Sequence, residues 1–153
     1  MPAALIRRLI CALLLASAWS EAEAANFVVR TAGAATVIAV DQDSVRRTGH
    51  YLTGWTYEMF RERNPLNGRR TQITGILELV NCKTLLVRRL KVVHYLDTGR
   101  VVSAVGPERA WIDSLRGSNT DLMLRAMCVG PDPVWARRRT GSVFELYRLV
   151  WPR

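Results

Sequence analysis

Residues 50–62 (HYLTGWTYEMFRE) and 70–82 (RTQITGILELVNC) are the two stretches of sequence that decide the fold. Apolar side chains recur at odd positions in both, at Tyr51, Trp55, Tyr57, Met59, Ile73, Leu77 and Leu79. A period of two is typical of a strand with one buried face. The composition of residues 64–68 (NPLNG) indicates a turn. The two stretches therefore predict a β-hairpin whose odd-numbered side chains face the core.

Further strands are predicted on both sides of this hairpin. Residues 36–40 form a short apolar run before it, and residues 84–96 form an alternating run after it, with His94 on the apolar side. A turn at Asp97–Gly99 leads into another apolar run at residues 100–105. Successive strands with short turns favour an antiparallel meander.

Two helices are predicted nearer the C terminus. Ser118 with Asp121 three residues on resembles a capping box and opens a helix over about residues 119–129, which is apolar nearly all round. Ser142 with Glu145 opens a second helix. The predicted fold class is thus α+β, an antiparallel β-sheet meander with a C-terminal helix packed on it.

The first 24 residues have the features of an export signal. Arg7 and Arg8 precede an apolar core at residues 9–19, and Ala22–Ala24 offers a small-x-small cleavage site. An uncleaved anchor is the alternative, but this core is too short to span a bilayer. Cys11 lacks the small residues that precede a lipoprotein cysteine, so no lipid anchor is expected. The mature protein is expected in the periplasm, at the cell surface or secreted.

Removal of that signal leaves two cysteines, Cys82 and Cys128. Two thiols in an oxidising compartment most often pair, so a disulfide that links the predicted helix to the sheet is expected. A reactive or metal-binding pair is the alternative. It is disfavoured because no C-x-x-C occurs and neither His50 nor His94 lies at zinc-ligand spacing.

The chain is strongly basic, with 22 Lys+Arg against 13 Asp+Glu in 153 residues and a net charge of +9. A basic surface attracts anionic partners, such as lipid headgroups, acidic polysaccharide or an acidic protein. Nucleic acid is not expected in an exported context, and a merely well-solvated surface is the alternative.

Residues 130–153 form a basic, aromatic-rich extension after the signal peptide (1–24) and the α+β domain (25–129). Its candidate partner-binding residues are Trp135, Arg137, Arg138, Arg139, Phe144, Tyr147 and Trp151. One interpretation is that the extension folds back and closes an edge of the sheet. The other is an amphipathic segment that docks on a membrane surface or partner. Peripheral membrane contact and a dimer are both compatible with the sequence.

Catalytic, metal and cofactor sites are not indicated. Glu58 and Glu78 lie on neighbouring predicted strands and could pair as carboxylates, but solvent-facing charges are the favoured interpretation. His94 is interpreted as a core or interface histidine. An unrecognised hydrolase that uses His50 or His94 is kept as a further hypothesis.

Several features follow one another in a characteristic order, namely Val40–Gly49 (VDQDSVRRTG), the strand with Trp55, Leu79–Lys83 (LVNCK), Tyr95, Gly99–Val102 (GRVV), Trp111 and the helix that ends in Cys128. This ordered set resembles the bacterial surface-adhesin protein E family. The resemblance implies an exported α+β domain and a non-catalytic envelope protein that binds extracellular-matrix and serum proteins. A periplasmic, envelope-associated accessory or structural protein is the alternative function.

Overall fold

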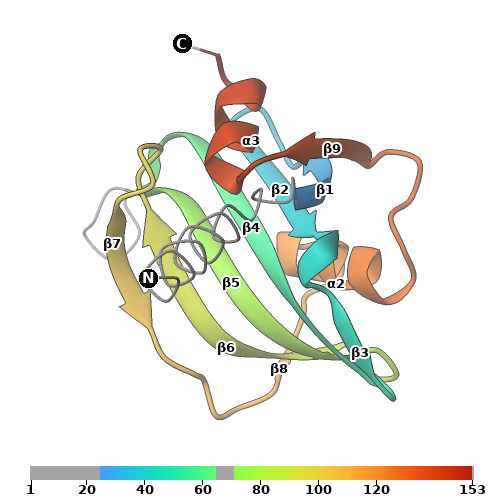
Figure 1. The fold of residues 1–153 in the computed structure, drawn as a ribbon. Coiled ribbons are helices and arrows are strands. Elements are labelled where there is room, and N and C mark those ends of the chain that lie inside the picture. Colours follow the sequence, from blue (N-terminus) through green and yellow to red (C-terminus); the bar gives the residue numbers. More distant parts are fainter. Residues whose placement is uncertain (1–24, 65–70, 153) are drawn as a thin grey trace, which may run out of the picture.

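The computed structural model describes residues 25–64 and 71–152. The predicted export signal and most of the predicted turn at residues 64–68 lie outside the described residues. The described part is an α+β fold in which one curled antiparallel sheet carries two α-helices (Figure 1).

The sheet has nine strands within the described residues. Their bounds are β1 Ala25–Thr31, β2 Thr36–Asp41, β3 Arg46–Thr48, β4 Tyr51–Asn64, β5 Thr71–Asn81, β6 Leu86–Tyr95, β7 Val101–Val105, β8 Ile112–Asp113 and β9 Ala136–Thr140. The strand order is β7-β6-β5-β4-β2-β1-β9, with β3 paired to β4 and β8 paired to β6. Every pairing is antiparallel, which confirms the predicted meander.

The predicted hairpin is the centre of this sheet. Strands β4 and β5 pair in continuous register from Tyr51 opposite Asn81 to Met59 opposite Ile73. Gly75 lies opposite Tyr57, and a Cβ at Gly75 would come within 3.0 Å of the Tyr57 ring. The missing side chain therefore leaves room for the Tyr57 ring beside the neighbouring strand.

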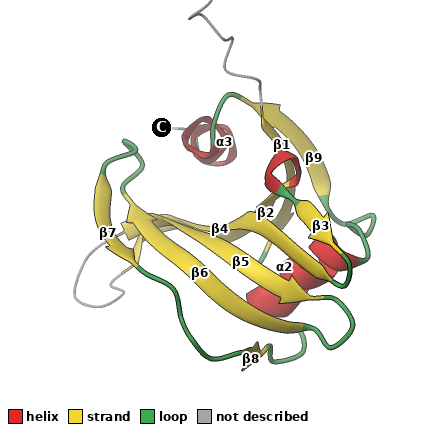
Figure 2. Cartoon of the chain, turned by 60° about the horizontal axis from the view of Figure 1, so that its bottom comes forward, coloured by secondary structure: helices red, strands yellow, loops and turns green. Residues whose placement is uncertain are grey.

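A helix packs on each face of the central strands, whereas the period-two pattern predicted one buried face. The even-numbered Leu52 and Thr56 are only 2% and 0% exposed, while the odd-numbered Trp55 and Tyr57 are half-buried. Helix α2 (Asn119–Cys128) packs on the even-numbered face and α3 (Val143–Val150) on the odd-numbered one, as Figure 2 shows. The expectation that the odd-numbered face alone is buried is therefore wrong, because alternation gives the period of a strand and not its environment.

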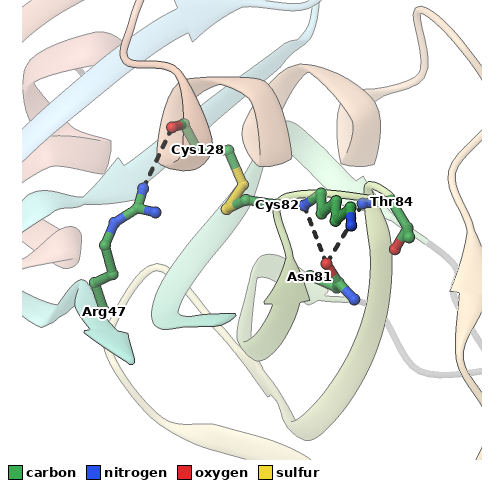
Figure 3. Close-up of a disulfide and its surroundings, with 6 residues drawn as sticks. Arg47, Asn81, Cys82, Thr84 and Cys128 are labelled. Carbon is green, nitrogen blue, oxygen red and sulfur yellow. Dashed lines mark hydrogen bonds between the residues drawn. A yellow bond between two sulfur atoms is a disulfide. The ribbon is translucent and has the colours of Figure 1, made fainter. Parts of the chain in front are cut away.

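Helix α2 is bonded to the sheet at its C-terminal end. Cys82 and Cys128 form the predicted disulfide, with 5.5 Å between their Cα atoms (Figure 3). Arg47 of β3 donates to the Cys128 carbonyl oxygen at 3.4 Å. In the β5–β6 turn the Asn81 side-chain oxygen accepts from the backbone N–H of Lys83 at 3.0 Å. The crosslink therefore joins an ordered turn to the end of the helix.

The two helices begin where their capping residues predict. Ser118 accepts from the Asp121 N–H, and Ser142 accepts from the Glu145 N–H. The reciprocal bonds differ from a capping box, because the acidic side chains accept from Gly117 and Gly141, one residue before each cap. A glycine at that position leaves its N–H open to the carboxylate.

Strands β1 and β9 were not predicted. Strand β1 pairs with β2 on one side and with β9 on the other. Strand β9 contains Arg137–Arg139 and shows no apolar alternation, so only its pairing with a distant segment makes it a strand. Residues 130–152 therefore supply an edge strand and a helix to the same sheet.

We predict that loss of the disulfide destabilises the fold without a change of topology. Loop-closure entropy for a crosslink between Cys82 and Cys128 corresponds to roughly 4 kcal/mol as an upper value. The double variant Cys82→Ala, Cys128→Ala should lose a large part of its free energy of unfolding in urea. The wild-type protein with reductant should behave like the variant, and identical stability with and without reductant would contradict the prediction.

Helix α3 offers a matched pair of leucines that tests its packing. Leu146 is fully buried and Leu149 is 65% exposed on the same helix. We expect Leu146→Ala to cost about 2 to 5 kcal/mol of unfolding free energy, because it opens a cavity between helix and sheet. Leu149→Ala should change that free energy by about 0.5 kcal/mol or less in the same urea titration. Equal effects would show that α3 does not pack on the sheet.

Candidate binding surfaces

One part of the sheet extends beyond the helix that covers its odd-numbered face. Helix α3 packs over Tyr57 and Tyr95, while side chains farther along β4, β5 and β6 have no described helix above them. We call this region the aromatic face and define it by Tyr51, Trp55, Leu77, Leu79, Arg88, Lys91 and Trp111. Apart from Trp111, which directly precedes β8, these residues lie on strands, which hold side chains in place better than loops do.

Paired rings dominate the aromatic face. Tyr51 and Trp111 lie 6.1 Å apart between ring centroids and are 44% and 38% exposed. Trp55 stacks on Tyr57 with centroids 6.2 Å apart. The Arg88 guanidinium lies 5.3 Å from the centroid of the Trp111 ring, within range of a cation–π contact. This arrangement keeps large rings partly in water on a supported surface.

The charge of the aromatic face is positive. Arg88 and Lys91 lie on β6, and within the described residues neither side chain forms an ion pair. Tyr, Trp and Arg are the residues most enriched where protein interfaces gain their affinity. A face with these side chains can bury a partner's apolar groups at its centre and pair with acidic groups at its edge.

The predicted arginines lie on another surface. Arg137, Arg138 and Arg139 are exposed on the edge strand β9. They border a pocket of about 460 Å³ that also includes Asn26 and Asp43. Hydrogen bonds from Asn26 hold the pKa of Asp43 below its ordinary value, and the nearby Arg139 acts in the same direction. This pocket therefore contains a persistent negative charge beside the three arginines.

The predicted aromatic residues of the extension pack within the fold. Trp135 is 8% exposed and belongs to the core under α2, while Tyr147 of α3 is 5% exposed and belongs to the core between α3 and the sheet. Phe144 packs edge-on against Tyr95 at 5.4 Å, and Trp151 packs against Tyr147 at 5.0 Å. These rings and the arginines of β9 do not share one surface. Partner binding by this set stays a prediction.

The expectation that Glu78 faces solvent is wrong. Its side chain is fully buried on β5, where Oε2 accepts from the Thr56 hydroxyl at 3.2 Å and Oε1 has no partner within the described residues. Burial raises the pKa of Glu78 to about 7. Glu58 remains half-buried and accepts from Asn119 at 3.1 Å. The two carboxylates therefore have separate partners.

His94 is a core histidine, as expected. Its ring nitrogen Nδ1 lies 3.1 Å from the Thr74 hydroxyl, and the residue is 9% exposed. Burial lowers the pKa of His94, which favours the neutral ring. In the described ranges no cluster of three or more His, Cys, Asp or Glu residues is arranged to hold a metal. No helix in those ranges is long and apolar enough to cross a membrane.

The aromatic face was not identified from the sequence, although a signal for it exists. The odd-numbered aromatic residues of β4 extend over more strand than a helix of 8 residues can cover. Trp111 gives no such signal, because only the pairing of β8 with β6 brings it beside Arg88.

A comparison with protein families finds a match. The family described as surface-adhesin protein E matches residues 27–129, about two thirds of the chain. The match runs from β1 to the end of α2, includes both disulfide cysteines and stops before β9 and α3. A comparison with curated proteins found no match.

Glu78 predicts a pH dependence of stability. The folded state holds the Glu78 proton up to about pH 7, whereas the unfolded chain releases it near its ordinary value of 4.5. Stability should therefore fall as pH rises from 4.5 to 7, by about 3 kcal/mol for a shift of this size. Glu78→Gln should lose this contribution to the pH slope in urea titrations at pH 5 and pH 8. The titration of His94 contributes equally to the wild-type protein and to the variant. The prediction is contradicted if the two proteins differ in unfolding free energy by the same amount at pH 5 and at pH 8.

Proposed function

Since the chain belongs to the surface-adhesin protein E family, we propose that it is an exported, non-catalytic binding protein of the bacterial envelope whose aromatic face holds a protein partner. Family membership supports an adhesin-like role at the cell surface and favours a non-enzymatic protein. The partner that it suggests is an extracellular or host protein. The aromatic face adds a place on the molecule where such a partner can bind.

The single observation that carries this proposal is the exposure of paired rings on the aromatic face. Burial of apolar surface contributes about 25 cal/mol per Å², and aromatic side chains offer more of that surface than other residues. Tyr51 and Trp111 still expose more than a third of their surface in the isolated chain. A partner that covers them gains the free energy of this apolar burial. The two rings already contact each other, so binding removes less side-chain entropy.

The positive charge determines which partners fit. Arg88 lies over the Trp111 ring, Lys91 lies on the same strand, and the whole chain has a net charge of +9. Complementary charge speeds encounter and excludes like-charged partners, and salt screens it. The proposed partner therefore presents acidic residues around an apolar centre. Binding should weaken as ionic strength rises.

We predict that the double variant Arg88→Ala, Trp111→Ala loses most of its binding to immobilised extracellular-matrix and serum proteins. Both residues are at least partly exposed, so the fold should persist. Hot-spot truncations cost about 2 kcal/mol or more, which corresponds to a loss of affinity of roughly thirtyfold. Surface plasmon resonance with the mature protein measures the change.

The matched control is Leu149→Ala, which removes an exposed apolar side chain from the outer surface of α3. It should bind like the wild-type protein. Equal loss in both variants, or unchanged binding in the double variant with an unchanged melting temperature, would reject the aromatic face as the binding surface.

A further inference from the structure

A pocket of about 770 Å³ lies between the end of α3 and the sheet. Arg61 of β4, Gln72 of β5 and the turn after β6 form one side, and residues 147–152 form the other. The α3 side lies beyond residue 129, where the family match ends. The pocket is therefore built jointly by the matched domain and by the extension.

The floor of this pocket is fixed by the Tyr147 hydroxyl. This oxygen lies 3.1 Å from the Phe60 carbonyl oxygen, to which it can donate, and accepts from Gln72 Nε2 at 3.0 Å. Gln72 Oε1 in turn accepts from the Asp97 N–H at 3.3 Å. One network thus ties α3 to β4, β5 and the turn after β6. These bonds hold the Tyr147 and Gln72 side chains in place, which lowers the entropy cost of binding.

The wall and rim of the pocket supply two kinds of contact. Trp151 is half-buried and packs against Tyr147 with 5.0 Å between ring centroids, so its indole forms a supported apolar wall. Arg61 and Arg148 are exposed at the rim. Within the described residues neither guanidinium has an ion pair. Both can take part in the bidentate bonds that arginine forms with carboxylates and sulfates.

We infer that this pocket binds an acidic saccharide. A sugar acid has an anionic group for Arg61 or Arg148, and its ring has an apolar C–H face that can lie on the Trp151 indole. Its hydroxyl groups can bond with the exposed Thr98 hydroxyl, which lines the pocket. Mostly apolar walls with a few placed polar groups are the usual composition of such sites.

Trp151 distinguishes a saccharide from a simple polyanion. The apolar C–H face of a sugar ring can lie on this indole, whereas phosphate groups and a run of acidic side chains have no such face. Acidic peptides and inorganic phosphate are therefore disfavoured. This site is separate from the aromatic face, so it does not depend on the proposed function.

The test is a titration of the mature protein with a hyaluronan tetrasaccharide, followed by calorimetry and by the indole N–H resonance of Trp151. We expect the tetrasaccharide to bind and to shift this resonance. Cellotetraose, hexaglutamate and inorganic phosphate should each bind with at least roughly tenfold lower affinity. Arg148→Ala and Arg61→Ala should each lower the affinity for the tetrasaccharide roughly tenfold or more, because each substitution removes a charged hydrogen-bond donor.

The charge-matched control is Arg138→Ala, on β9 and outside this pocket, which should leave binding unchanged. Unchanged melting temperatures for the three arginine variants exclude unfolding as the cause of any loss. The assignment is overturned if the tetrasaccharide does not bind, or if hexaglutamate or phosphate binds equally well. It is also overturned if Arg138→Ala weakens binding as much as Arg148→Ala does.

Discussion

The pairing of β4 with β5 is the constraint on which the rest of the structure depends. Its register sends alternate side chains to two helices, with Leu52 and Val80 under α2 and Met59 and Ile73 under α3. A slip of β5 by one residue would turn its side chains to the opposite faces and move the buried Glu78 off the face that α2 covers. The disulfide at the end of β5 also fixes this register, because Cys82 can meet Cys128 only when its strand is correctly placed.

The lengths of the elements explain why the odd-numbered face has one covered and one uncovered end. Helix α3 has 8 residues and so spans about 12 Å, whereas the 14 residues of β4 extend for about 46 Å. A helix this short covers Tyr57 and leaves the strand from Trp55 to Tyr51 without a described helix above it. The aromatic face is thus a consequence of this mismatch, and Tyr51 pairs with Trp111 where no described helix packs on them.

The sequence predicted those parts of the fold that have a local signal. Ser118 and Ser142 placed both helix starts, since a capping hydroxyl acts within one turn. Strand β9 was missed because its three arginines form a strand only by pairing with β1, more than one hundred residues away in the chain. Glu78 was misplaced because a period of two does not show that a second helix will cover the polar face. The candidate surfaces were missed for the same reason, since Arg88 meets Trp111, and Arg61 approaches α3, only through long-range packing.

The segment after the family match both stabilises the domain and adds a surface to it. Strand β9 covers the outer edge of β1, whose N–H and C=O groups would otherwise be open to pairing with another chain. Helix α3 buries Phe27, Met59 and Ile73, which would otherwise lie in water. The Tyr147 hydroxyl that ends this packing reaches the backbone of β4, and the space left beside it is the pocket at the end of α3. The contacts that pack α3 on the sheet also shape this pocket, so a substitution that removes the pocket would also expose the core. The exposed arginines at its rim can be substituted without that effect.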